Sequence, residues 1–129
     1  SFSNFVFFKT NYSVPESDWK DFNLTNIDKL IEADKIVFVD ITADWCVTCQ
    51  YNKINVLNSK IIEEAFNKFN VIKVKGDWTK PDKNIQKFLE KNKRYGIPFN
   101  IIYSKKNPEG IILSELLSEN EIINSLNRL

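Results

Sequence analysis

The sequence predicts an α/β fold in which a mixed central β-sheet is flanked by helices on both faces. The apolar, β-branched run over residues 36–42 is typical of a strand that is buried on both faces and therefore central in its sheet. Segments of helix-like and strand-like periodicity alternate from residue 25 onward. The chain then ends with two strand-like segments joined by a turn and a last helix, so the order is β-α-β-α followed by β-β-α.

The first half of this pattern opens with a short helix. The capping-box sequence Thr-Asn-Ile-Asp at 25–28 predicts where this helix begins. After the strand at 36–42, a helix is expected from Cys46 to about Leu57. Another helix is indicated by apolar residues at helical spacing, which are Ile62, Ala65, Phe66 and Phe69.

The second half supplies the remaining strands. A strand is predicted at 71–75, followed by a helix that begins with Thr-Lys-Pro-Asp at 79–82, with the proline in its first turn. Strands at 99–103 and 111–113 flank the turn Asn-Pro-Glu-Gly and form an antiparallel pair. The sequence Ser-Glu-Asn-Glu at 118–121 caps the last helix.

Composition limits what the chain can bind. Its 129 residues suffice for one domain, which we place at 19–129, with an N-terminal arm or linker at 1–18. A net charge of +1 gives no reason to expect nucleic acid as a partner. With no His and two Cys, the chain lacks the ligands of a zinc, copper or haem site, so we expect no metal and no bound cofactor. Because the chain starts at Ser1 and has no Met, we expect a mature or excised fragment.

The two cysteines, Cys46 and Cys49, form a Cys-x-x-Cys pair directly after the buried strand. This place puts the first sulfur at a helix N-terminus, where unpaired N–H groups and the helix dipole favour the thiolate. Such settings lower a Cys pKa from ~8.5 into the range ~3.5–7.5, so we expect Cys46 to be the more exposed and nucleophilic thiol. Cys49, largely buried, would then resolve the mixed disulfide. The alternative is an inert structural pair, but the preceding Trp45 favours redox chemistry.

The segments around this pair resemble the thioredoxin superfamily and imply a thioredoxin-like fold. More narrowly, residues 19–129 resemble the C-terminal extracytoplasmic domain of DsbD-type thiol:disulfide interchange proteins. The supporting sequences are Phe-Val-Asp at 38–40, Ala-Asp-Trp-Cys-Val-Thr-Cys at 43–49, Asp-Trp-Thr at 77–79 and Gly-Ile-Pro-Phe at 96–99.

The resemblance implies roles for further residues. Pro98 matches the cis-proline that lies against the cysteines, and Ile97 would offer backbone groups to a partner strand; the alternative is an ordinary trans turn proline. Asp40 matches the buried acid beneath the cysteines. Burial should raise its pKa, which suits proton transfer with Cys49, unless the acid merely reaches a cap or solvent. Trp45 is expected to shield the disulfide and to form part of the docking surface.

One position departs from the resemblance. Relatives of the DsbD type often carry an acid at the position of Lys53, which on a helix shares a face with residues 46 and 49. The lysine removes a possible second proton-handling acid. We expect it either to lower the pKa of Asp40 or of the thiols, or to extend into solvent.

These features predict a disulfide reductase whose dithiol takes electrons from a membrane-embedded partner module and passes them to oxidised periplasmic proteins. No His lies between the cysteines, which favours a reductant over a strong oxidase. Two alternatives stay open: a free-standing thioredoxin-like general reductase, and a protein-binding or chaperone module with incidental cysteines. The resemblance implies a periplasmic domain, tethered to the inner membrane within a larger protein and monomeric when isolated.

Overall fold

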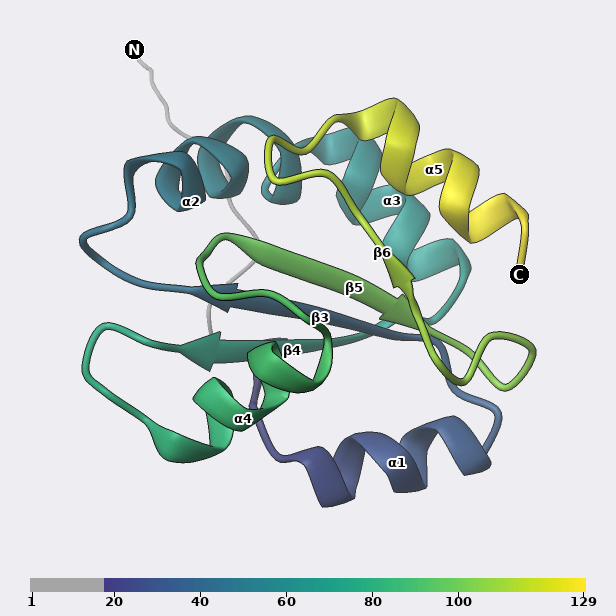
Figure 1. Ribbon diagram of the computed structural model, residues 1–129. Helices are drawn as coiled ribbons and strands as arrows, with labels where there is room; N and C mark the ends of the chain where they lie inside the picture. The colour runs from purple at the N-terminus through teal and green to yellow at the C-terminus, as the bar shows by residue number, and fades with distance from the viewer. Residues whose placement is uncertain (1–17) are drawn as a thin grey trace, which may run out of the picture.

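A five-stranded mixed sheet forms the centre of the part of the chain that the computed structural model describes, residues 18–129 (Figure 1). The predicted arm at 1–18 lies outside the described residues except for Asp18. The strand order is β2-β4-β3-β5-β6; β2, β4 and β3 are parallel, whereas β5 is antiparallel to both β3 and β6. The strands are β2 (Lys20–Asp21), β3 (Val37–Thr42), β4 (Ile72–Asp77), β5 (Phe99–Tyr103) and β6 (Ile111–Ile112). The predicted mixed sheet with a central strand at 36–42 is thus confirmed.

Helices cover both faces of this sheet, as the sequence predicts. Figure 1 shows α1 and α4 on one face and α2, α3 and α5 on the other. The predicted helix from Cys46 to about Leu57 is present, but its second half, η2, is a π-helix. The helices are α1 (Leu24–Glu32), α2 (Val47–Asn52), η2 (Lys53–Leu57), α3 (Lys60–Lys68), α4 (Lys83–Lys91) and α5 (Glu119–Asn127).

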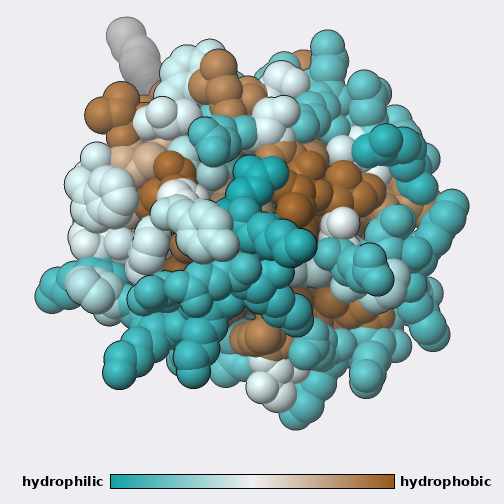
Figure 2. Space-filling view, in the orientation of Figure 1, coloured by the Kyte–Doolittle hydropathy of each residue, from teal (hydrophilic) through white to brown (hydrophobic). Residues whose placement is uncertain are grey.

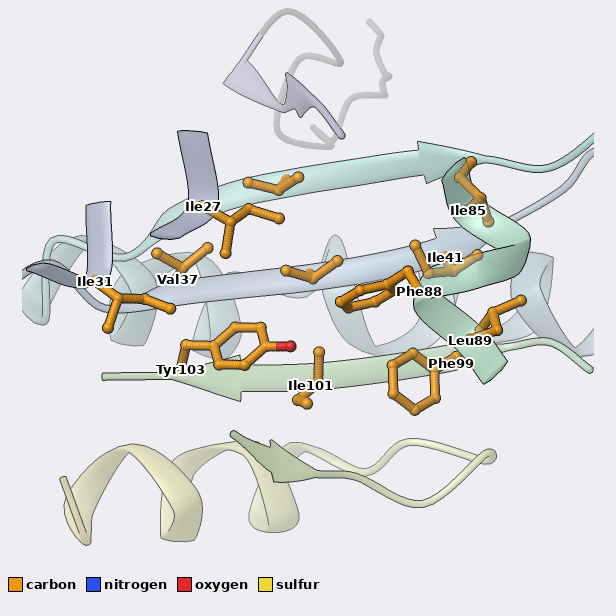
Figure 3. Packing of buried hydrophobic residues seen from close by; sticks show 12 residues of the cluster. Ile27, Ile31, Val37, Ile41, Ile85, Phe88, Leu89, Phe99, Ile101 and Tyr103 are labelled. Atoms are coloured by element: carbon orange, nitrogen blue, oxygen red, sulfur yellow. The ribbon is translucent and has the colours of Figure 1, made fainter. Parts of the chain in front are cut away.

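Alternate residues of β3 face the two helical layers. Val37, Val39 and Ile41 belong to the core beneath α1 and α4, where Figure 3 shows side chains of both helices against the strands. Phe38 belongs to the other core, with residues of α3, η2 and α5. Since side chains along a strand alternate between its faces, Asp40 points to the same side as Phe38. The one acid of β3 therefore faces the helical layer that begins with the cysteines.

Two helices begin at other residues than predicted. The N-cap of α1 is Asn23, whose Oδ1 accepts a hydrogen bond of 3.0 Å from the Asn26 N–H, so the capping-box prediction at 25–28 is wrong. The N-cap of α4 is Asp82, which places Pro81 before the helix and not in its first turn. The cause is the same in both cases: short Asn and Asp side chains reach the free N–H groups of a first turn well and rank with Ser as N-caps.

Candidate active site

A disulfide joins Cys46 and Cys49 where the loop after β3 enters α2. Cys46 is the N-cap residue of this helix, with an extended backbone (φ −93°, ψ 106°). Its Sγ accepts a hydrogen bond of 3.2 Å from the Cys49 N–H. The N–H groups of a first helical turn have no partner within the helix, so they would also stabilise a thiolate released at this sulfur by reduction.

The two cysteines differ little in exposure. Cys46 is 7% exposed and Cys49 is 3% exposed. Cys46 is thus the more exposed of the two, as expected, but it is itself buried in the disulfide form. Both pack with Ala43 and Ile97 in a small apolar cluster. The Ile97–Pro98 peptide bond is cis, as the resemblance implies, and Ile97 brings it beside the cysteines.

Large apolar side chains near the disulfide are exposed. Trp45 is 60%, Val47 83% and Tyr95 79% exposed. They come from the loop before α2, from its first residue and from the segment that leads to the cis-proline. Figure 2 shows apolar surface in the upper left of the view, where α2 lies, whereas hydrophilic residues dominate around α4 and the loop before it. Exposed apolar side chains beside a redox pair are suited to docking a partner chain.

Thr79, in the loop after β4, holds the residues that precede Cys46. The Trp45 indole N–H donates to the Thr79 carbonyl oxygen (3.2 Å), and the Asp44 backbone N–H donates to Thr79 Oγ1 (2.9 Å). The Thr79 hydroxyl in turn donates to Asp77 Oδ1 (2.5 Å). Nothing in the sequence alone predicts this link, because 34 residues separate Trp45 from its partner.

Asp40 lies between two residues of neighbouring strands, with Lys75 of β4 on one side and Asn100 of β5 on the other. It is partly buried and lines a cavity of about 40 Å³ together with Lys53 and Lys75. Burial raises the pKa of Asp40 from its ordinary value of 3.8 to about 7, while the ammonium groups of Lys75 and Lys53 act in the opposite direction. The expected rise of the pKa is confirmed, and so is the expectation that Lys53 acts on this acid.

Asn52, buried at 2% exposure in the last turn of α2, ties this helix to the segment before α5. Its Nδ2 donates to the Glu115 carbonyl (2.8 Å) and its Oδ1 accepts from the Leu117 N–H (3.0 Å). A buried polar side chain is expected to be satisfied in this way. The sequence does not reveal this role, since both partners lie more than 60 residues away.

Over 18–129, no group of three or more His, Cys, Asp or Glu side chains is placed to hold a metal ion. No helix of that part of the chain is long and apolar enough to cross a membrane.

A family model described as thioredoxin-like matches residues 18–105, which include Asp40, the disulfide and the cis-proline. The chain belongs to the thioredoxin-like family. No curated protein matches this thioredoxin-like chain by sequence.

Solved structures share the fold of this thioredoxin-like protein. The oxidised C-terminal domain of DsbD from Neisseria meningitidis superposes with a TM-score of 0.66 at 19% identity, over 81% of this chain and 90% of that chain. Its reduced form gives 0.63 at 19% identity, over 84% and 97%. A mutant thioredoxin from Halobacterium salinarum gives 0.62 at 16% identity, over 91% and 95%. At these identities the likeness shows the fold alone, and it confirms the thioredoxin-like fold implied by the resemblance.

Proposed function

We propose that this thioredoxin-like protein is a thiol–disulfide oxidoreductase that acts as a disulfide reductase. The observation that carries the proposal is the Cys46–Cys49 disulfide at a helix N-terminus, on the side of the sheet toward which Asp40 also points. A purely structural disulfide needs neither a helix N-terminus at one sulfur nor an acid of raised pKa behind the helix.

The reaction begins with the reduced pair. The Cys46 thiolate attacks one sulfur of the partner's disulfide; a Cys46–partner S–S bond forms, the partner's own S–S bond breaks, and its other sulfur leaves as a thiolate. The Asp40 carboxylate takes the proton of the Cys49 thiol. The Cys49 thiolate then attacks Cys46 Sγ, so the Cys46–Cys49 bond forms and the second partner sulfur leaves as a thiolate. Two electrons have passed to the partner, whose two sulfurs take up protons from solvent.

The pKa of Asp40 suits this proton transfer. A general base works best when its pKa lies near the working pH, because both protonation states are then populated. An ordinary Asp, with a pKa of 3.8, would be a poor acceptor for a thiol proton, whereas burial brings Asp40 to about 7. Lys53 and Lys75 keep the pKa from rising further.

Partner docking would use residues around the disulfide, of which Trp45 is exposed, Ile97 half-buried and Pro98 buried. Ile97 packs against the cysteines, and its backbone would pair with an extended partner segment in the manner of an added strand. Trp45 and Pro98 would flank that segment, with the exposed indole of Trp45 offering apolar contact. Such backbone pairing accepts many partner sequences, which a reductase that acts on several different proteins requires.

The electron donor we propose is a membrane-embedded domain upstream in the same protein, with oxidised periplasmic proteins as acceptors. The fold shared with the DsbD C-terminal domain and the sequences at 43–49 and 96–99 support this route. The domain would then be periplasmic and tethered to the inner membrane. A free-standing reductase, reduced instead by a soluble enzyme, is the second candidate, which the fold shared with a thioredoxin supports.

Turnover of a model disulfide substrate with dithiothreitol as reductant tests the activity. Wild-type protein should accelerate the reaction, Cys46→Ser should abolish the acceleration, and Cys49→Ser should stall as a mixed disulfide. Unchanged turnover by Cys46→Ser would refute the reductase and favour a binding module. The proteins that Cys49→Ser traps as mixed disulfides in its host cell then distinguish the two proposed electron donors. A trapped membrane protein supports the proposed route, and a trapped soluble reductase supports the second candidate.

A further inference from the structure

Asn100, the second residue of β5, is a buried polar residue whose side chain has no hydrogen-bond partner among the described residues. It is 1% exposed, and neither its Oδ1 nor its Nδ2 is hydrogen-bonded within the described residues. The large majority of buried side-chain polar atoms in proteins are bonded, and an unbonded one is unfavourable. An apolar side chain would fit a buried strand better, so the amide calls for a role that outweighs its cost.

The position of Asn100 suggests that role. It is the antiparallel partner of Asp40, and opposite residues of such a pair point to the same face with Cβ atoms about 4.5–5.5 Å apart. The neighbouring Phe99 and Ile101 belong to the core beneath α1 and α4, so Asn100 faces the other side, as Asp40 does. The amide and the carboxyl group therefore lie on adjacent strands and on the same face of the sheet.

Charged groups lie around Asp40, and the neutral polar residues Thr42, Gln50 and Asn58 line the same cavity. Lys75 flanks Asp40 on β4, Lys53 reaches the same cavity from η2, and Asp44 lines it from the loop after β3. On the β5 side, the neighbour of Asp40 is the neutral Asn100. An amide is both donor and acceptor, so it can bond either protonation state of a carboxyl group.

We propose that Asn100 is a positioning residue for Asp40, whose carboxyl group it bonds once the Cys46–Cys49 disulfide has been reduced. Its Nδ2 donates to the Asp40 carboxylate before the Cys49 proton is transferred. Its Oδ1 accepts from the Asp40 carboxylic acid after that transfer. This inference rests on the proposed function, in which Asp40 is the base for Cys49. The bond to the carboxylate is the stronger of the two, because hydrogen bonds to an ionised acceptor exceed those between neutral groups. Asn100 therefore favours the basic form of Asp40.

The test is the pH dependence of the second exchange step, in which Cys49 attacks the mixed disulfide. In Asn100→Leu, which is similar in volume, the pH midpoint of this step should rise by roughly one pH unit because the carboxylate has lost a donor. Asn100→Ala should show the same rise and serves if the leucine variant does not fold. Ile102→Val is the matched control, since it alters the same face of β5 opposite Phe38 and should leave the midpoint unchanged.

The chemical shift of the Asp40 carboxyl carbon, followed by NMR across pH, gives the pKa of Asp40 without relying on activity. This pKa should rise in the same variants. The double variant Asp40→Asn/Asn100→Leu separates the two claims. If Asp40→Asn alone leaves the second step unchanged, the role of Asp40 in the proposed function fails. If Asp40→Asn changes the step, but Asn100→Leu and Asn100→Ala leave both the midpoint and the carboxyl titration unchanged, the role of Asn100 is overturned. A shift that Asn100→Leu causes in the wild-type background and not in Asp40→Asn supports it.

Discussion

Replacing Asp40 by Asn should change how the stability of the protein depends on pH. The pKa of Asp40 is raised to about 7 in the folded protein from an ordinary value of 3.8. Between these two values the folded state holds a proton that the unfolded state has released. The free energy of unfolding of the wild-type protein therefore falls as the pH rises from about 4 to about 7, and the loss is complete above that range.

The size of this loss follows from the same two values. A difference of about three pH units corresponds to about 4 kcal/mol, at about 1.4 kcal/mol for each unit. Because Asp40 is only partly buried, solvent screening reduces the effect, and we expect about 2–3 kcal/mol. Asp40→Asn removes the ionisable group, so the variant should match the wild type near pH 4 and exceed its stability by about 2–3 kcal/mol at pH 8.

Urea unfolding of the oxidised proteins between pH 4 and pH 8 measures this difference. Asp34→Asn is the matched control, because it removes an exposed carboxylate from the turn after α1 and should follow the wild-type curve. Wild-type and Asp40→Asn curves that stay parallel over the whole range would refute the reasoning, since they would mean that Asp40 titrates alike in the folded and unfolded states.

Three further predictions concern residues around the same site. Lys53→Gln should raise the pH midpoint of the second exchange step, because an ammonium group that lowers the pKa of Asp40 is lost; stopped-flow kinetics across pH would show this, and an unchanged midpoint would count against it. Asn52→Leu should lower the free energy of unfolding by about 2–3 kcal/mol, because the buried Leu117 N–H and the partly buried Glu115 carbonyl lose their partner. Urea unfolding measures this change, and a neutral result would contradict the assigned anchor role. Thr79→Val should speed hydrogen exchange of the Asp44 amide about tenfold, since its acceptor is removed; NMR detects this, and unchanged exchange would show that the bond does not restrain the loop.

Local patterns in the sequence suffice for the main elements of the fold. The strand at 99–103 agrees with β5 residue for residue, and the predicted cap at Ser118 accepts the expected hydrogen bond from the Glu121 N–H (3.1 Å). β2 escapes prediction, because its two residues pair with β4 only through the tertiary fold. The π-helical turn of η2 could not be predicted either, since apolar periodicity does not distinguish it from the α-helix that it continues.

Some residues of the candidate site can likewise be predicted from the sequence, whereas others cannot. Cys46, Cys49 and Pro98 belong to contiguous motifs, and Asp40 is conspicuous as the acid in an apolar strand, so all four can be picked from the sequence. Lys75 and Asn100 flank Asp40 only through strand register. Register depends on how whole strands pair, and a slip by one residue would turn both side chains to the opposite face. The structure is therefore needed to show that Lys75 and Asn100 lie next to Asp40.

Mapping of the mixed disulfide tests the central claim of a two-step exchange most directly. The reduced Cys46→Ser and Cys49→Ser variants are mixed with an excess of a model disulfide, quenched with acid after short times, and analysed by mass spectrometry of their peptides. The proposed roles predict a mixed disulfide on Cys46 that forms rapidly and persists in Cys49→Ser, and little or none on Cys49 in Cys46→Ser. A mixed disulfide that forms on Cys49 as fast as on Cys46 would contradict the assignment of nucleophile and resolving thiol.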